Sequence, residues 1–181
     1  MLKKLELGVG DRPTEGYLHQ DIKALTDLDF FCNPWEVDLP ENSLDEVIAV
    51  GVMEHLRFAD FHKTLKHIHK LLKPDGIFLF DVPDLLVWSK YLYKVLRNEE
   101  VPFTREHILS TFWGWQRWEG DEHKSGWVTD TILLYVINAG FKGLEYVNPK
   151  EFKDRGIFRN RFDRPEDAHI YVKTVKRWGN I

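Results

Sequence analysis

The feature that most constrains this chain lies near its start, where two glycines follow a short apolar segment. Leu5 and Leu7 are typical of a buried strand, and Gly8 and Gly10 come directly after it. Glycine adopts positive φ at little cost and lets another molecule approach backbone N–H groups. At the carboxyl end of a first parallel strand, this turn is a natural place for a nucleotide-like ligand. Asp21, at the predicted end of a second strand, can accept hydrogen bonds from both hydroxyls of a ribose. Taken alone, the Gly-x-Gly pattern also fits an ordinary tight turn.

Composition limits the classes of protein to consider. A chain of 181 residues suits one domain with one core. The net charge of −4 provides no basic field for nucleic acid, so no nucleic-acid partner is expected. The single cysteine, Cys32, excludes an internal disulfide and fits a reducing compartment. No apolar run approaches the roughly 18 to 20 residues that span a membrane, and no signal peptide is evident. We therefore expect a cytoplasmic protein without membrane contact.

Apolar patterning predicts strands that alternate with helices. Strands are expected at 17–22, 28–31, 47–50, 77–82, 141–147 and 169–175, and helices at 60–72, 84–97 and 129–139. Asp60 is a reasonable N-cap for the first helix. This order favours an α/β fold with a mostly parallel sheet, helices on both faces and an antiparallel C-terminal hairpin. We expect a single domain over residues 1–181, with an irregular or mixed insertion around 98–126 on the substrate side.

Five short segments then occur in the order of a known family. They are Glu6–Gly10 with Asp21, Leu39–Ile48, Val52–Leu56, Leu71–Gly76 and Ala139–Phe141. With them, nearly the whole chain resembles the class I S-adenosyl-L-methionine-dependent methyltransferases. It is most similar to small predicted members with Gly16-Tyr17 after the glycine turn and a later His123 to Gly126 segment. The resemblance implies a Rossmann-like methyltransferase sandwich.

The resemblance also implies how S-adenosyl-L-methionine would bind. The backbone of the glycine turn would lie against its methionine part, with Glu6 reaching the amino group, and Asp21 would hold the ribose. Asn33 and its neighbours fall where the family contacts adenine. The floor near the sulfonium would be formed after the fourth strand. The implied cofactor-binding residues are Glu6, Gly8, Val9, Gly10, Asp21, Ile22, Asn33, Pro34, Trp35, Gly51 and Val52.

Two departures from the family pattern affect the expected activity. Arg12 occupies the position of a third glycine, and the short gap from Gly10 to Asp21 leaves little room for the usual first helix. The helices that often precede the glycine turn are also absent, so we expect a more open site or one completed by another copy in a homo-oligomer. A catalytically inactive methyltransferase-like binding module is therefore the alternative hypothesis. A nicotinamide dehydrogenase is disfavoured because Pro13 stands where its third glycine should be.

Methyl transfer needs a positioned acceptor and, often, a base. Candidate bases are His55, Glu54, His107 and His123. His55 follows the fourth strand, close to the expected methyl group, although a structural role at a helix start is also consistent with its place. Glu54 fits a helix-capping role. His123 lies in a polar loop beside Asp121 and Glu122, which can tune its pKa, or it is a solvated loop histidine. His55 and His123 are the predicted catalytic residues.

Aromatic residues gather in the insertion. Trp113, Trp115 and Trp118 can line a pocket for a planar or sugar-like acceptor, but packing under a long loop is the favoured interpretation. The sequence therefore predicts methylation of an oxygen or nitrogen of a small molecule or saccharide.

Two further clusters are interpreted as structural. His62, His67 and His69 lack the i, i+4 spacing of helical zinc pairs, so no metal is expected. Four arginines, at positions 155, 159, 161 and 164, alternate with acidic residues. A solvated loop is the favoured interpretation, and an anionic substrate is the lesser alternative.

Overall fold

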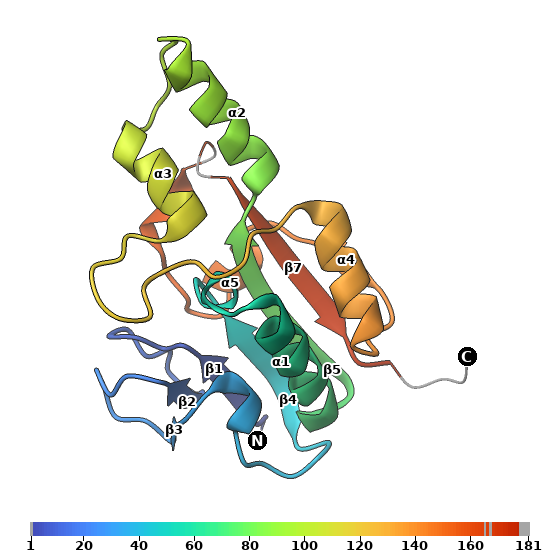
Figure 1. Cartoon of the computed structure of the whole chain (residues 1–181). Helices are drawn as coiled ribbons and strands as arrows, with labels where there is room; N and C mark the ends of the chain where they lie inside the picture. The colour runs from blue at the N-terminus through green and yellow to red at the C-terminus, as the bar shows by residue number, and fades with distance from the viewer. Residues whose placement is uncertain (1, 165, 167, 178–181) are drawn as a thin grey trace.

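A computed structural model describes residues 2–164, 166 and 168–177 of the protein (Figure 1). Seven strands form one sheet in the order β3-β2-β1-β4-β5-β7-β6. The strands are β1 (Lys4–Leu7), β2 (Leu18–Asp21), β3 (Phe30–Phe31), β4 (Leu44–Ala49), β5 (Leu72–Pro83), β6 (Leu144–Tyr146) and β7 (His169–Val175). β1 to β5 pair in parallel, whereas β7 pairs antiparallel with both β5 and β6. The predicted mostly parallel sheet with an antiparallel C-terminal pair is confirmed.

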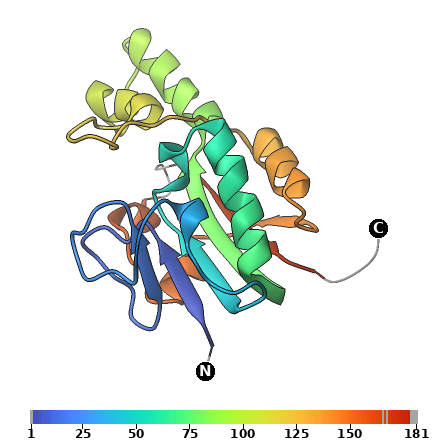
Figure 2. The ribbon, with the colours of Figure 1, turned by 60° about the horizontal axis from the view of Figure 1, so that its bottom comes forward.

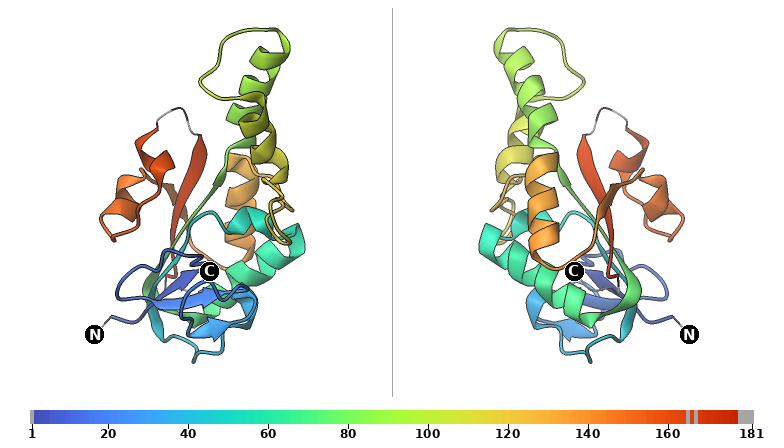
Figure 3. Two further views of the ribbon diagram at one scale, coloured as in Figure 1. Left: turned by 90° about the vertical axis from the view of Figure 1, so that its left-hand side faces the viewer. Right: turned by 90° about the vertical axis from the view of Figure 1, so that its right-hand side faces the viewer.

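Helices surround this sheet, as predicted for an α/β fold. α1 (Phe58–Leu71) and α4 (Thr129–Asn138) cover one face, and the short α5 (Lys150–Lys153) lies on the other (Figures 2 and 3). α2 (Leu85–Leu96) and α3 (Arg105–Trp113) extend beyond the carboxyl edge of the parallel strands (Figure 1). Single 3₁₀ turns occupy Pro34–Glu36 (η1), Met53–His55 (η2) and Asn160–Asp163 (η3). Within the described residues, every helix is too short or too polar to cross a membrane.

Two apolar clusters hold the layers together. On one face, Phe61, Leu65 and Ile68 of α1 recur at helical spacing and are fully buried against β4 and β5. On the other face, Phe152 of α5 and Tyr171 of β7 pack with inner residues of β4 and β5. Complete burial of one such side chain contributes about 1.5–3 kcal/mol. The sheet is therefore fixed from both sides, and its carboxyl edge is left for a site.

Several predicted boundaries differ in the structure. α1 begins at Phe58 after Arg57, so Asp60 lies in the first turn and is not the N-cap. β6 covers only residues 144–146 of the predicted 141–147 strand. The insertion contains α3, which begins where the Thr104 side chain accepts a hydrogen bond from the backbone N–H of His107. A threonine N-cap is a local signal that could have predicted this helix.

The connection from β1 to β2 is a loop over residues 8–17, all of which are described, and it contains no helix. The Glu6 carboxylate holds this loop: Oε2 accepts from the Thr14 N–H at 2.8 Å and Oε1 accepts from the Thr14 hydroxyl at 3.0 Å. Burial raises the pKa of Glu6, although both hydrogen bonds oppose the rise. The expectation that the short gap excludes the usual first helix is confirmed.

Candidate active site

A cleft opens where the parallel strands end. Its first part, which we call the glycine lobe, has a volume of about 640 Å³ and is lined by the residues that follow β1, β2 and β4. The structure brings together there Gly8, Val9, Gly10, Asp21, Ile22, Asn33, Pro34, Trp35, Gly51, Val52 and His55. Of the eleven predicted cofactor-binding residues, only Glu6 is outside this lining, because its carboxylate holds Thr14.

Two glycines shape the floor of the lobe for different reasons. Gly8 has φ +62°, and a Cβ there would lie 2.3 Å from Cγ2 of Val52, so any side chain would collide with the protein. Gly10 also has φ +62°, but a Cβ there would meet no atom within 4 Å. The space above Gly10 is therefore open to a ligand, which can approach the backbone closely.

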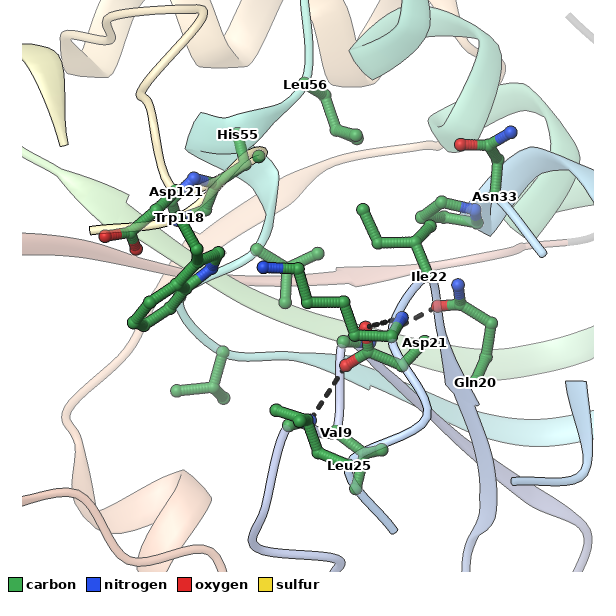
Figure 4. Close-up of a pocket in the computed structure, with 18 of the residues that line it drawn as sticks. Val9, Gln20, Asp21, Ile22, Leu25, Asn33, His55, Leu56, Trp118 and Asp121 are labelled. Carbon is green, nitrogen blue, oxygen red and sulfur yellow. Dashed lines mark hydrogen bonds between the residues drawn. The ribbon is translucent and has the colours of Figure 1, made fainter. Parts of the chain in front are cut away.

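The Asp21 carboxylate joins the two strand ends. Its Oδ2 accepts from the Gly10 N–H at 2.8 Å and its Oδ1 accepts from the Lys23 N–H at 2.9 Å (Figure 4). Each carboxylate oxygen has a second lone pair, so both oxygens can still accept a hydroxyl from a ligand in the lobe. The residue itself is mostly buried, which fixes the direction of these acceptors.

The wall opposite the glycine turn comes from the start of η1. The Asn33 side-chain N–H donates to Oε2 of Glu36 at 2.8 Å, and Pro34 occupies the first position of the 3₁₀ turn. The Lys63 ammonium lies 5.0 Å from the centre of the Trp35 ring. These contacts hold in place a wall that combines an amide, a proline ring and an indole, which are groups that can contact a planar base.

A second part of the cleft, which we call the arginine lobe, adjoins the first and has a volume of about 440 Å³. The two lobes share Arg12, Gly51, His55, Arg117, Asp121, Arg159 and Arg161 in their walls. The arginine lobe adds Glu54, Pro83, His107, Ser110, Thr111, Trp115, His123, Arg164 and His169. Five arginines and two carboxylates line this lobe, so its lining carries a net positive charge even with its four histidines neutral.

Asp81 contacts Gly51 and Arg161, which line both lobes. It was not predicted as a site residue. It is fully buried at the end of β5, and its Oδ1 accepts from the Gly51 N–H at 2.8 Å. Its Oδ2 lies 2.5 Å from Nη2 of Arg161 and 3.0 Å from Nδ1 of His169. Although burial opposes ionisation, Arg161 and His169 hold the pKa of Asp81 well below its usual range. An acid at the end of an apolar strand was the available sequence signal.

The two predicted catalytic histidines lie side by side. Their ring centroids are 4.9 Å apart and their planes are nearly perpendicular. The loop that carries His123 is tied to η2, because the Lys124 N–H donates to the Glu54 carbonyl at 2.9 Å. Burial lowers the pKa of His123, while the nearby Glu54 charge opposes that change. Glu54 itself is buried in η2, before Arg57 caps α1, so the predicted capping role is wrong.

The three tryptophans of the insertion are each about half exposed, so the favoured packing interpretation is wrong for them. Trp118 lines the glycine lobe, and the guanidinium of Arg117 lies 4.3 Å from the centre of its ring. Trp115 lines the arginine lobe. Loop 114–126 therefore presents aromatic faces to the cleft rather than to the core.

The arginine-rich segment is also not a solvated loop. Arg155 is paired with Glu46 at 2.7 Å, and Arg159 and Arg161 line the cleft, whereas Arg164 alone of the four is largely exposed. The α1 histidines lie outside both lobes: Nε2 of His67 is 2.9 Å from the Val37 carbonyl. The sequence did not indicate that these arginines line the cleft, because they follow β6 and reach the site only through tertiary packing.

A twisted sheet of this order, with a glycine turn after β1 and an acid at the end of β2, has the fold of the class I S-adenosyl-L-methionine-dependent methyltransferases. A family profile described as "Methyltransferase domain" matches residues 11–146, which is most of the chain. The protein therefore belongs to this family of methyltransferase domains. No curated protein sequence matches the chain.

Solved structures agree with this assignment. An S-adenosylmethionine-dependent methyltransferase from Mesorhizobium loti is 17% identical, with 96% of this chain and 90% of that chain covered and a TM-score of 0.57. Phosphoethanolamine N-methyltransferase 2 of Haemonchus contortus, in complex with S-adenosyl-L-methionine, is 16% identical, with 98% and 49% covered and a TM-score of 0.53. A Haloferax volcanii complex of the Trm112 methyltransferase activator with a protein assigned as a methyltransferase is 16% identical, with 100% and 86% covered and a TM-score of 0.58. At these identities the likeness shows the fold.

Proposed function

We propose that the protein binds S-adenosyl-L-methionine in the glycine lobe and transfers its methyl group to an oxygen or nitrogen of a small molecule or saccharide. The observation that carries the proposal is the meeting of an open glycine turn, the Asp21 carboxylate and the Asn33–Trp35 wall around one cavity. Turn, acid and wall suit the amino-acid, ribose and base parts of one ligand. When bound, this cofactor supplies a methyl group on a sulfonium, which is a good leaving group.

The residues would divide the work as follows. The turn at Gly8–Gly10 offers its backbone to the methionine part, and Asp21 accepts from the ribose hydroxyls. Gly51 and Val52 form the floor between the two lobes. The acceptor enters from the arginine lobe, where His55 and His123 are placed to receive its proton. In the transfer, the sulfur–carbon bond breaks as the acceptor–carbon bond forms, and the sulfonium becomes a neutral thioether.

The charge of the arginine lobe supports an acceptor that carries an anionic group, such as a phosphate or carboxylate. Arg161 is already paired with Asp81. Arg159 has no carboxylate within ion-pair distance among the described residues, and its side chain lines the cleft. Burial lowers its pKa, although the Glu6 charge opposes this change. A half-buried guanidinium without a close counter-ion is best satisfied by an anionic ligand.

Calorimetric titration with S-adenosyl-L-homocysteine tests the cofactor site. We expect saturable one-site binding that Asp21→Ala weakens at least about tenfold, because two charged hydrogen bonds are lost. Asp29→Ala is the matched control, since the Asp29 carboxylate also accepts a backbone N–H, that of His19 at 2.8 Å, but outside the cavity. Absence of binding at millimolar ligand would refute the proposal.

Turnover separates the enzyme from the inactive binding module. Incubation of the protein with S-adenosyl-L-methionine and a library of hydroxyl- and amine-bearing compounds should release S-adenosyl-L-homocysteine, most strongly with anionic members. Cofactor binding without any product across the library would favour the binding module.

A further inference from the structure

The lining of the arginine lobe contains a group of potential metal-ligand side chains from two distant segments. Glu54 and His55 come from η2, and His123 comes from the loop after α3. One potential ligand atom of each residue lies within 4.8 Å of those of the other two. The chain reaches this arrangement only because residues 122–125 are hydrogen-bonded to η2 and α3.

The hydrogen bonds of the two histidines fix which nitrogen is available. Nδ1 of His55 lies 3.1 Å from the Glu122 carbonyl, and Nδ1 of His123 lies 3.0 Å from the Thr111 carbonyl. A carbonyl oxygen can only accept, so each Nδ1 carries the proton and each Nε2 keeps its lone pair. Metal-binding histidines usually donate their second ring N–H to a carbonyl or carboxylate in this way.

The third side chain is an acid with one oxygen that accepts no hydrogen bond from the described part of the chain. Glu54 is only 4% exposed, and its Oε2 is buried without a hydrogen bond to any described residue. An unsatisfied buried carboxylate oxygen is costly, and it is rarely retained unless something else satisfies it. A cation bound between Glu54 and the two Nε2 atoms would do so.

We propose that Glu54, His55 and His123 bind a divalent transition-metal cation in the arginine lobe. Two imidazoles and one carboxylate suit Zn²⁺, Mn²⁺ or Fe²⁺ and leave further positions open to water or a ligand. Donors around Zn²⁺ at bond lengths of about 2.0–2.1 Å lie roughly 3.3 Å apart, so the side chains must close slightly around the ion. The histidines that the sequence analysis examined for a metal, those of α1, are not part of this site.

The consequence for chemistry rests on the proposed function. Glu54, His55 and His123 line the same lobe as the arginines, so an acceptor in that lobe could reach a cation bound by these three residues. A cation there would bind the acceptor oxygen as a Lewis acid and ease loss of its proton to solvent. His55 and His123 would then act through the ion, and the arginines would hold an anionic group of the same acceptor.

Metal titration tests the site without any methyl transfer. Protein freed of metal with a chelator is titrated with Zn²⁺ and Mn²⁺ by calorimetry, and with Co²⁺ by visible absorption, which reports nitrogen and oxygen ligation. We expect one site, with an affinity that His55→Ala, His123→Ala and Glu54→Gln each reduce at least about tenfold. His62→Ala is the control, because it removes a histidine on α1 outside both lobes, and it should leave the affinity unchanged.

Far-ultraviolet circular dichroism and thermal unfolding show whether each variant is folded. Binding of S-adenosyl-L-homocysteine, measured separately on the wild-type protein, keeps the two proposals distinguishable. If one of these variants is not folded, His123→Gln, which keeps a polar side chain and lies outside the lining of the glycine lobe, tests the site in its place. If the protein binds S-adenosyl-L-homocysteine but no cation, the metal proposal alone is overturned. The same holds if the three variants leave the cation affinity unchanged. A protein that binds the cation but not the homocysteine compound refutes the proposed function and leaves the metal site standing.

Discussion

The two lobes of the cleft share one wall but differ in the segments of the chain that line the rest of each lobe. Apart from the wall that both lobes share, the glycine lobe is lined mainly by segments 8–11, 20–25, 33–35 and 50–57, which lie next to the ends of the parallel strands, and its acid is already held by neighbouring N–H groups. Apart from that shared wall, the arginine lobe is lined mainly by Glu54, by residues between 107 and 123, and by Arg164 and His169, which come from distant parts of the chain. The difference shows that the glycine lobe is positioned mainly by the ends of the parallel strands, whereas the arginine lobe depends on ion pairs and hydrogen bonds between distant segments. It also predicts which changes affect one lobe and which affect both.

Asp81→Asn should have the largest effect, because Asp81 supports both lobes through Gly51 and Arg161. Removing its charge leaves a buried guanidinium unpaired, at an expected cost of about 3–5 kcal/mol in the free energy of unfolding. Urea denaturation measures this cost. Asp154→Asn, an exposed acid paired with Lys150, is the control and should change the midpoint little.

The same variant should alter the acid sensitivity of the protein. The pKa of Asp81 is lower in the folded state than in the unfolded state, so its contribution is present above the unfolded pKa of about 4 and is lost as pH falls through the folded value. The difference in stability between wild type and Asp81→Asn should therefore be largest near neutral pH and should shrink in acid. A difference that stays constant down to pH 2 would contradict this account.

Gly10→Ala should affect the glycine lobe alone. The added Cβ meets no protein atom within 4 Å but enters the ligand space, so affinity for S-adenosyl-L-homocysteine should fall by at least about tenfold. Gly143→Ala, also at positive φ and with open space around it, carries a comparable backbone cost far from the cleft. If both variants bind the ligand equally, the turn does not contact it. Cation binding at Glu54, His55 and His123 should survive in both.

Arg159 lines both lobes, but Arg159→Gln should weaken binding of the acceptor much more than binding of the cofactor. Loss of one charged hydrogen bond should raise the KM for an anionic acceptor by about tenfold or more. The affinity for S-adenosyl-L-homocysteine should change less than about threefold. Arg97→Ala removes an exposed charge outside the cleft and should change neither value. An equal loss of both affinities would instead place Arg159 against the carboxylate of the cofactor.

Trp118→Ala should give the smallest loss of ligand affinity, and it tests whether loop 114–126 contacts a ligand in the glycine lobe. Trp118 lines that lobe, whereas Trp113 lines neither lobe although both rings are about half exposed. A single aromatic contact contributes about 0.5–1.5 kcal/mol, so a loss of a few-fold in ligand affinity is expected for Trp118→Ala and none for Trp113→Ala. Calorimetry of both variants decides whether the loop contacts the ligand.

Much of the glycine lobe could be predicted because its signals are local. Gly8 and Gly10 follow one predicted strand and Asp21 lies at the end of the next, and parallel strands bring their carboxyl ends to one edge. Glu6 shows the limit of this reasoning. Its position was predicted, but only the structure shows that Thr14 uses both carboxylate oxygens.

The arginine lobe was less predictable, even where single residues were singled out. His55 and His123 were candidates, but their contact depends on hydrogen bonds between residues about seventy positions apart, such as that from His55 to the Glu122 carbonyl. Hydrogen bonds between residues so far apart produce no periodic pattern in the sequence, so sequence patterns cannot predict them.

By itself, the sequence determined the alternation of strands and helices, the glycine turn and the acid at the end of β2, because strand and turn propensities act over a few residues. Only the tertiary structure decided that an apparently solvated arginine segment lines a cleft and that Asp81 pairs with Arg161, eighty residues away. It also brought Glu54 beside two histidines. The physical reason is that burial and charge pairing are properties of the packed chain, and they give a side chain its chemistry only after distant segments meet.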